Sequence, residues 1–270
     1  MTEPRGSTGM RYRSAPERRA RLLQIVEERG FSSTTELMIE LGVSDMTVRR
    51  DAQKLSEGGS VRIVHGGVSA LPSTDLQGSR QYEERAGLMA TAKAALGRAA
   101  ASRVSRDQAI AIDAGTTSRE LARALPASLP ITVVTHSASA VADLMTRSST
   151  TLIALGGVLH HETLSFEGEL VVRAIGELHL DTFYLAASGI GPRGVFCAND
   201  FDAVTKRALI SVADRVVLLV DSSKFHASAM VRVCDFSSVD EVLVDDGISD
   251  DDLAMLIDAG TAVTVVPVAG

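Results

Sequence analysis

Seven short apolar runs recur along the C-terminal part of this chain, and they constrain its fold more than any other feature. They lie at residues 109–113, 131–135, 151–155, 182–188, 215–221, 241–245 and 261–266. Stretches with helical spacing separate most of these runs, and one such helix is expected near residues 83–103. Nearly continuous apolar strands that alternate with helices are typical of a parallel sheet buried on both faces. The sequence therefore predicts an α/β domain over residues 81–270.

The N-terminal part has a different pattern, in which three short helical stretches precede two β-prone runs. Ser33 or Thr34 can cap the second helix, and Ser44 is a good N-cap for the third. The two β-prone runs lie in SVRIVHGGV, residues 60–68, and their Gly-Gly pair is typical of a hairpin. Three helices followed by a hairpin over residues 15–71 predict a winged helix-turn-helix.

Two segments have the composition of irregular chain. Residues 1–14 are rich in Gly, Ser, Thr and Arg without any period, which predicts a disordered arm. They contain no apolar stretch, so they do not resemble a secretory signal. Residues 72–80 are polar and include Pro72 and Gly78, so we expect a linker between the two domains there.

Charge is distributed unevenly along the chain. The formal net charge is −7, yet residues 1–72 carry 11 basic and 9 acidic side chains, whereas the remaining residues carry 16 and 25. This asymmetry suggests an anion-binding module attached to an acidic domain. Within that module, Arg49 and Arg50 stand side by side on the third predicted helix.

The third predicted helix has the features of a helix that reads DNA. In a helix-turn-helix, the N-terminal residues of this helix lie over base edges in the major groove. Arginine can pair with guanine or bind a phosphate. Two arginines alone would favour an ordinary solvated face with an Asp45–Arg49 ion pair, but the cap, the core spacing and the wing favour DNA binding. The candidate DNA-binding residues are Ser44, Asp45, Met46, Thr47, Arg49, Arg50, Lys54, Arg62 and His65.

Residues 17–68 resemble the DNA-binding domain of the DeoR family of bacterial transcriptional regulators. In that family a helix containing VS and then TVRRD precedes a wing that ends in HGG, and both features are present here. Ala52 stands where the family usually has Leu, which leaves the expected DNA-facing residues unchanged. The matching positions are Gly42, Val43, Ser44, Thr47, Arg49, Arg50, Asp51, Leu55, His65, Gly66 and Gly67.

Three loops of the α/β domain carry polar or glycine residues directly after predicted strands. The first runs into a helix, whose backbone N–H groups and dipole would favour an anion. All three loops lie at carboxyl ends of strands, where α/β sheets bind ligands. Gly-Thr turns cap helices in many proteins, so the prediction of a binding site depends on the three loops together. Their residues are Gly115, Thr116 and Thr117, then Thr135 and Ser137, and then Gly156 and Gly157.

Lysine is rare in this chain, which uses arginine for most of its positive charge. Only four of the 27 basic residues are lysines. A retained lysine can mark a place where a compact ammonium is needed, although an ordinary surface lysine is the simpler alternative. Lys206 and Lys224 could both approach an anionic ligand in the α/β domain.

Residues 80–250 resemble the sensor domain of the same DeoR family, which is related in fold to ribose-5-phosphate isomerase. The resemblance runs through DAGTT (113–117), VVTHS (133–137), LGG (155–157), ASGIGPRG (187–194) and DSSKF (221–225). His136 stands where the family usually has Asn, which could alter the effector. The resemblance implies that a phosphorylated sugar or similar metabolite binds among Asp113, Gly115, Thr116, Thr117, Thr135, His136, Ser137, Gly156, Gly157, Lys206 and Lys224.

Several kinds of site are not expected from the composition. Cys197 and Cys234 are too few for a disulfide framework and are not spaced as a metal motif. His160 and His161 would point to opposite faces of a strand, so they do not predict a metal site. No apolar run reaches the ~18 residues that cross a bilayer, so we expect a cytoplasmic protein without membrane contact. We also expect no metal, no cofactor and no catalytic residue.

The sequence thus predicts a transcriptional regulator, most simply a repressor, that binds double-stranded operator DNA and responds to a phosphorylated metabolite. A homodimer or homotetramer is expected because two half-sites supply the specificity that one winged helix lacks. One alternative is a sugar-phosphate isomerase-like enzyme fused to a DNA-binding domain, with Asp113, Glu167, Glu169 and Asp221 as possible bases. Another is an α/β domain that serves only for oligomerisation.

Overall fold

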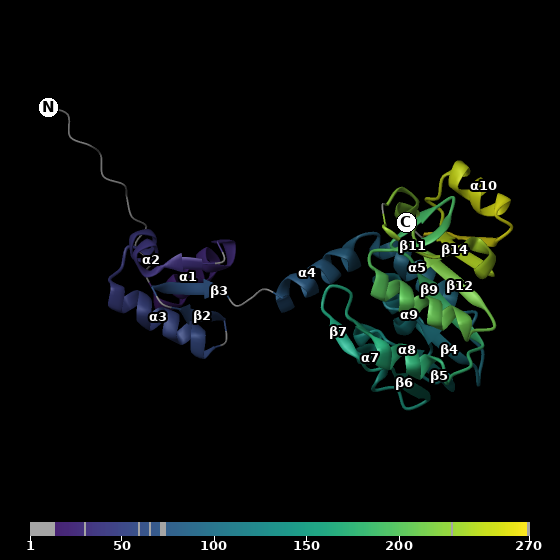
Figure 1. Ribbon diagram of the computed structural model, residues 1–270, viewed down its shortest axis with the longest axis horizontal. Coiled ribbons are helices and arrows are strands. Elements are labelled where there is room, and N and C mark those ends of the chain that lie inside the picture. Colours follow the sequence, from purple (N-terminus) through teal and green to yellow (C-terminus); the bar gives the residue numbers. More distant parts are fainter. Residues whose placement is uncertain are drawn as a thin grey trace. The chain divides into compact units, whose positions relative to one another are not determined.

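The computed structural model describes residues 14–29, 31–58, 60–64, 66–70, 74–227 and 229–268. The chain divides into two compact units, residues 1–75 and residues 76–270 (Figure 1). The arm expected over residues 1–14 lies outside the described residues except for Ser14. Within the described ranges, no helix combines the length and the apolar character needed to cross a membrane.

The first unit contains three helices and a three-stranded antiparallel sheet. The helices are α1 (Ala15–Arg29), α2 (Thr34–Leu41) and α3 (Asp45–Glu57), and the strands are β1 (Phe31–Ser33), β2 (Val61–Val64) and β3 (Gly67–Ala70). β3 lies between β1 and β2 in the sheet. The predicted winged helix-turn-helix is confirmed. β1 was not predicted, because a three-residue strand with one apolar residue carries no alternating pattern.

Local hydrogen bonds fix the turn of the helix-turn-helix. Ser33 caps α2: its hydroxyl accepts from the Glu36 N–H at 3.2 Å, and its own N–H donates to the Glu36 carboxylate at 2.8 Å. α2 ends at Gly42, whose φ of +64° is left-handed and whose N–H donates to the Met38 carbonyl. Ser44 then begins α3 without a side-chain cap bond. The sequence around these two turns therefore sets where α3 starts.

A small apolar core and one ion pair hold α3 against the rest of the unit. The Asp51 side chain, 6% exposed, accepts from Arg18 Nε of α1 at 2.5 Å. Asp51 thus faces inward, while Arg49 and Arg50 just before it are exposed. The apolar core comprises Leu22, Ile25, Val26, Leu37, Leu41, Val48, Ala52, Val61 and Val68.

The second unit is built on a seven-stranded sheet in which all neighbouring strands are parallel. The strand order is β15-β14-β12-β9-β4-β5-β6. Each of the seven apolar runs found in the sequence forms one of these strands, so the predicted parallel α/β sheet is confirmed. The strands are β4 (Ala109–Ile112), β5 (Ile131–Thr135), β6 (Thr150–Ala154), β9 (Thr182–Ala186), β12 (Val216–Val220), β14 (Glu241–Asp245) and β15 (Ala262–Val266).

Helices cover both faces of this sheet (Figure 1). Ile110 and Ile112 of β4 pack with α5, α6 and α7, whereas Ala111 between them packs in the core formed with α8, α9 and α10. Gly97 of α5 lies so close to α6 that a Cβ there would be 2.5 Å from the Glu120 backbone. The helices are α5 (Ala90–Ala101), α6 (Thr116–Ala124), α7 (Ala138–Leu144), α8 (Glu169–Ile175), α9 (Asp200–Ser211) and α10 (Asp250–Asp258).

The region between the units is helical from Thr74: α4 (Thr74–Gly87) begins inside the predicted linker 72–80, which stays a prediction. One expectation about this region was wrong. The single helix expected near residues 83–103 is two helices, α4 and α5, separated by a turn in which Met89 has a φ of +53°. Gly87, the last residue of α4, directly precedes this turn, so the sequence carried a signal for the break that the prediction of one helix did not use.

Short elements at the carboxyl ends of the parallel strands were not anticipated. β7 (Val158–His160) and β8 (Ser165–Glu167) form a hairpin, and β10 (Gly189–Gly191), β11 (Gly194–Cys197) and β13 (Val231–Cys234) form a small antiparallel sheet. Two 3-10 turns, η1 (Ser222–His226) and η2 (Phe236–Ser238), follow β12 and β13. All of these elements except η2, which leads into the amino end of β14, add loops around the edge of the sheet where ligands bind in α/β folds.

Replacing Asp51 by Asn is expected to destabilise the winged helix. The substitution leaves the partly buried Arg18 guanidinium without a countercharge, at a cost of about 3 kcal/mol. Urea unfolding of the full chain, followed by hydrogen exchange of α1 and α3 amides, measures the change. Asp45→Asn is the matched control, because its exposed pair with Arg49 is worth less than about 1 kcal/mol. Equal effects of the two substitutions would contradict a structural role for Asp51.

Candidate functional sites

The first turn of α3 presents a mixed polar and apolar surface. Ser44 and Met46 are exposed, with Met46 74% accessible, while Asp45 and Thr47 are half-buried. The Ser44 and Thr47 hydroxyls lie 3.0 Å apart, so they orient each other. A methionine this exposed at the start of a reading helix can contact the methyl group of thymine.

Four basic residues of the first unit are exposed where DNA contacts were expected. Arg50 and Lys54 of α3 and Arg62 of β2 make no ion pair with any described residue. The Arg49 Nε donates to the Asp45 carboxylate at 2.8 Å, so the ion pair of the simpler alternative is present. An exposed pair of this kind contributes only about 0.3–0.5 kcal/mol, so Arg49 can exchange it for a phosphate at little cost. His65 lies outside the described residues.

The second unit contains a cavity of about 230 Å³ at the carboxyl ends of β4, β9 and β12. The turn after β4, the residues after β9, helix α9 and η1 all contribute to its wall. This is the edge of a parallel sheet where α/β proteins bind ligands. The lining residues are Arg85, Ala114, Gly115, Thr116, Thr117, Thr163, Ala186, Ala187, Ser188, Ala198, Asp202, Lys206 and Lys224.

One wall of the cavity has the features of an anion site. Gly115 is the N-cap of α6 and provides no side-chain cap, so the first backbone N–H groups of that helix, with the Thr116 and Thr117 hydroxyls, are available to a ligand. Lys224 also lines the cavity and makes no ion pair with any described residue. A helix N-terminus and an unpaired ammonium both favour a negatively charged group.

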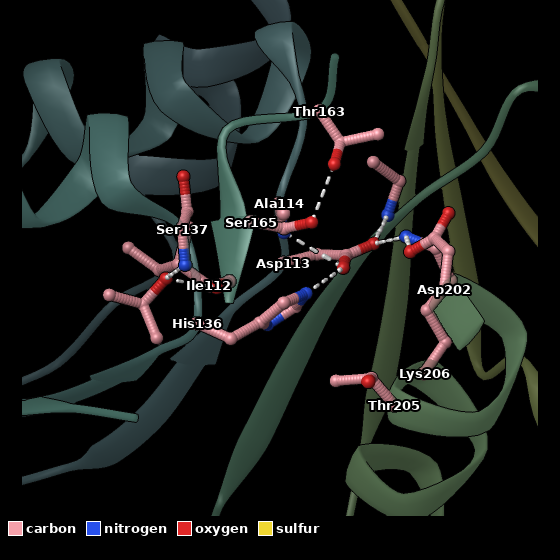
Figure 2. Close-up of polar contacts among 12 residues, drawn as sticks. Ile112, Asp113, Ala114, His136, Ser137, Thr163, Ser165, Asp202, Thr205 and Lys206 are labelled. Atoms are coloured by element: carbon pink, nitrogen blue, oxygen red, sulfur yellow. Dashed lines mark hydrogen bonds and ion pairs between the residues drawn. The ribbon is translucent and has the colours of Figure 1, made fainter. Parts of the chain in front are cut away.

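A buried ionic cluster forms the floor of the cavity. Figure 2 shows Asp113, which follows β4, between His136 on one side and Lys206 on the other. The Lys206 ammonium forms ion pairs with Asp113 and, at 3.2 Å, with Asp202. The Asp113 carboxylate also accepts from the Ala114 N–H at 2.8 Å and from the Ala186 N–H at 2.7 Å. Asp113 therefore joins β4, β9 and α9 in one network.

Burial determines the protonation states in this cluster. Burial lowers the pKa of His136 to about 4, and the Lys206 charge adds to this shift, so the imidazole is neutral at pH 7. Its Nε2 lies 3.6 Å from Asp113 Oδ1, and neither ring nitrogen has a hydrogen-bond partner. Burial would also lower the pKa of Lys206, but the Asp113 and Asp202 charges outweigh it and raise that pKa. Burial raises the pKa of Asp202 in turn.

The same cluster has the donor atoms of a metal site but holds a cation of its own. Asp113, His136 and Asp202 offer ligand atoms that all lie within 4.8 Å of one another. The Lys206 ammonium is already paired with both carboxylates and supplies the positive charge there. A divalent cation would have to displace it, at the cost of an unpaired buried ammonium.

Six predicted effector residues are absent from the cavity lining: Asp113 and His136, which belong to the buried cluster beneath it, and Thr135, Ser137, Gly156 and Gly157. The Thr135 hydroxyl donates to the Ile112 carbonyl at 2.7 Å, and the Ser137 hydroxyl caps α7. Gly157 packs against the Glu167 backbone, where a Cβ would come within 2.5 Å, and Gly156 adjoins it. The Thr135 and Ser137 side chains thus complete the sheet edge, and Gly157 permits a close approach of the chain. By contrast, the cavity brings together Gly115, Thr116, Thr117, Lys206 and Lys224.

Eight of the thirteen lining residues were not predicted, and two of these eight come from elements distant from the strand ends. Arg85 belongs to α4, and Thr163 lies in the turn of the β7–β8 hairpin. Neither follows a strand of the main sheet, so the argument from strand ends could not find them. The sequence around Arg85 gives no signal either, because Glu83 and Glu84 directly precede it and the arginine looks like part of an ordinary charged helix surface.

A chain of hydroxyls leads from the cavity wall to a buried carboxyl. The Thr163 and Ser165 hydroxyls lie 2.6 Å apart, and Ser165 donates to Glu167 Oε1 at 2.6 Å. Burial raises the pKa of Glu167 to about 7. His160 Nε2 lies 3.5 Å from Glu167 Oε2, and its ring stacks on Phe201 at 4.1 Å. His160 is therefore engaged in packing rather than placed beside further metal ligands.

A winged helix with an exposed basic reading helix, joined to an α/β unit with a cation-lined cavity, defines the class of sensor-linked DNA-binding regulators. Two family models match the chain: "DeoR-like helix-turn-helix domain" over residues 18–74 and "DeoR C terminal sensor domain" over residues 89–246. The chain therefore belongs to the DeoR family of transcriptional regulators, as its resemblance predicted.

Individual relatives agree with this membership. The chain is 34% identical to the uncharacterized HTH-type transcriptional regulator YgbI of Escherichia coli (strain K12), over 86% of this chain and 90% of that one. It is 32% identical to the glycerol-3-phosphate regulon repressor of the same strain, over 83% and 88%. Among solved structures it is similar to ribose 5-phosphate isomerase A of Methanocaldococcus jannaschii, with 18% identity and a TM-score of 0.36 over 49% of this chain and 52% of that one.

Replacing His136 by Asn is expected to make the protein more resistant to acid. The buried imidazole stays neutral down to about pH 4, whereas in the unfolded chain it is protonated below its ordinary pKa of 6.5. Its low folded-state pKa therefore reduces stability as the pH falls from 6.5 towards 4, by about 2 kcal/mol between pH 7.5 and pH 5. Urea unfolding at these two pH values should give a smaller loss for His136→Asn. His179→Asn, at an exposed position, should behave like the wild type; a wild-type slope in His136→Asn would contradict the prediction.

Proposed function

We propose that this DeoR-family protein is a repressor whose affinity for operator DNA changes when a phosphorylated sugar or related metabolite binds in the cavity. The observation that carries the proposal is the meeting of the α6 N-terminus with Lys224 in one cavity. Backbone N–H groups, two hydroxyls and an ammonium form the donor set that a phosphate accepts. The name of one relative, the glycerol-3-phosphate regulon repressor, supports the same class of effector.

On this proposal the DNA contacts come from α3 and the wing. Ser44, Asp45, Met46 and Thr47 lie over base edges, while Arg49, Arg50 and Lys54, with Arg62 and the predicted His65, contact bases or phosphates. We further propose that the protein acts as a homodimer or homotetramer, because paired half-sites supply affinity and specificity that one winged helix lacks. Typical coupling of ~1–3 kcal/mol would weaken DNA binding roughly 5–150-fold at saturating effector.

Two of the four possible bases, Asp113 and Glu169, are already engaged in other contacts, which favours binding over catalysis at those positions. An isomerase needs a base that is free to take a proton from the substrate. Asp113 is fully buried and already accepts from two backbone N–H groups and Lys206. Glu169 is exposed and paired with Arg173, away from the cavity lining. Turnover of a sugar phosphate by the purified protein would overturn this preference.

A thermal-shift screen tests the effector proposal. Sugar and polyol phosphates are compared with their unphosphorylated forms, and a ligand at 100 times its Kd should stabilise the protein by about 2.7 kcal/mol. Thr117→Val keeps the side-chain volume but removes a cavity hydroxyl, so it should weaken binding about 10-fold. Thr151→Val, on the exposed edge strand β6, is the control and should bind as the wild type does. A hit that does not require the phosphate would contradict the proposal.

Two substitutions in α3 test the DNA interface. Arg50→Ala should weaken operator binding by about 1–3 kcal/mol and relax base preference at one position. Lys54→Ala should weaken binding to all sequences alike and reduce the salt-dependence slope by about 1. Fluorescence anisotropy at several salt concentrations, on operator DNA selected by the protein from random sequence, gives both quantities. Arg98→Ala, an exposed arginine of α5 in the second unit, is the control; a similar loss there would remove the case for α3.

A further inference from the structure

Helix α4 connects the two units along the chain and also reaches the cavity. The chain passes from β3 to α4 within three residues, and the unit boundary falls at Asp75, near the start of this helix. Further along α4, Tyr82 is fully buried, and its hydroxyl lies 2.8 Å from the Ser139 hydroxyl of α7. One turn later Arg85 lines the cavity and donates to the Glu162 carbonyl in the β7–β8 hairpin. The second half of α4 is therefore fixed beside the cavity.

Lys93 holds the C-terminal end of the same helix. After the turn at Met89 the chain reverses into α5, and the Lys93 ammonium donates to the Arg85 carbonyl in the last turn of α4. Carbonyls at a helix C-terminus lack partners within the helix and attract cations. Lys93 is only 2% exposed, so this hydrogen bond satisfies a buried group. The side chain of Arg85 thus lines the cavity, while the backbone carbonyl of Arg85 accepts the hydrogen bond from Lys93.

The charges around this end of α4 are not balanced. Arg85, Lys93 and Lys224 make no ion pair with any described residue, whereas Lys206 is paired with two carboxylates. The charged groups that face Lys93 are Asp221, Lys224, Arg85 and Glu120. Burial lowers the pKa of Lys93 to about 8; the Asp221 and Glu120 charges oppose this shift, and the Lys224 and Arg85 charges add to it. The cavity therefore has an excess of positive charge that an anion would neutralise.

We propose that Arg85 and Lys93 link an anion in the cavity to the C-terminal end of α4. The anion accepts hydrogen bonds from the Arg85 guanidinium and lowers the repulsion on the Lys93 ammonium, so both residues hold the last turn of α4 more tightly. α4 follows the winged helix directly along the chain. A more stable last turn of α4 therefore makes the segment that leads out of the DNA-binding unit more rigid. This inference rests on the proposed function, which requires only that the cavity binds an anion.

Hydrogen exchange of the full-length protein tests the link, with inorganic phosphate as the probe. In the wild type, phosphate should slow exchange of the α4 amides at least about fivefold, the low end of typical coupling. Arg85→Gln should bind phosphate more weakly, through the α6 N-terminus and Lys224, and its Tm should still rise at higher phosphate concentration. At phosphate concentrations that saturate this variant, the α4 protection should nevertheless disappear. Arg85 is exposed, so this variant is expected to fold. Arg98→Gln, an exposed arginine on α5, should behave as the wild type does.

Proton uptake provides a second readout for Lys93. Neutralising the nearby cations should raise the proton affinity of Lys93, so phosphate binding at pH 8.5 should take up part of a proton. Calorimetry in two buffers of different ionisation enthalpy measures this uptake, and Lys93→Met should abolish it. If Lys93→Met does not fold, the α4 hydrogen exchange of Arg85→Gln and the proton uptake of the wild type still test the link.

The outcomes separate the two proposals. Suppose that phosphate raises the Tm of the wild type. If Arg85→Gln then keeps the α4 protection, or if the wild type takes up no proton, the link through Arg85 and Lys93 is overturned while the proposed function stands. If phosphate and the phosphorylated metabolites neither raise Tm nor slow exchange in the wild type, the proposed function fails and the inference fails with it. The link is supported if Arg85→Gln loses the α4 protection while it still binds phosphate, and the wild type and Arg98→Gln keep that protection.

Discussion

The buried ammonium of Lys206 sets the main constraint on the second unit. A charge without solvent is tolerated only when it is paired and hydrogen-bonded, and here Asp113 and Asp202 supply that pairing. Asp113 can do so because β4 ends beside β9, whose Ala186 N–H donates to the same carboxylate. The cluster therefore fixes α9 against two central strands and leaves Lys206 neutralised. The free positive charge lies instead on the cavity wall, where a ligand can use it.

The first unit uses charge in a similar way. Asp51 pairs with Arg18 inside the winged helix, which orients α3 so that the neighbouring Arg49 and Arg50 face solvent. Inward and outward charges alternate along one helix because successive residues are rotated by about 100°. In both units, then, a buried ion pair fixes a helix, and unpaired cations on the surface or cavity wall remain for DNA phosphates or for an anionic effector. The same division leaves positive charge exposed in both units of a chain whose formal net charge is −7.

The predicted loop residues of the effector site were found by their place after strands, whereas Lys206 and Lys224 were singled out by the scarcity of lysine. The rule identified the sheet edge, and Gly115, Thr116 and Thr117 do line the cavity. It could not tell which loops turn towards the cavity, because the Thr135 hydroxyl is taken by the Ile112 carbonyl and Gly157 serves packing. It also could not find Arg85, which reaches the cavity from a helix outside the sheet.

Sequence alone determined the longer strands and the helices of the winged unit, because periodicity, caps and glycine turns act over a few residues, whereas it did not reveal the three- and four-residue strands at the sheet edge. It fixed seven parallel strands, three helices and a wing, and it carried the family resemblance that the comparisons confirmed. The tertiary structure decided what depends on contacts between distant segments: the strand order, the neutral state of His136, the pairing of Lys206 with Asp113 and the contact of Arg85 with the β7–β8 hairpin. These follow from burial, and the burial of a charged or titratable group depends on which remote parts of the chain surround it.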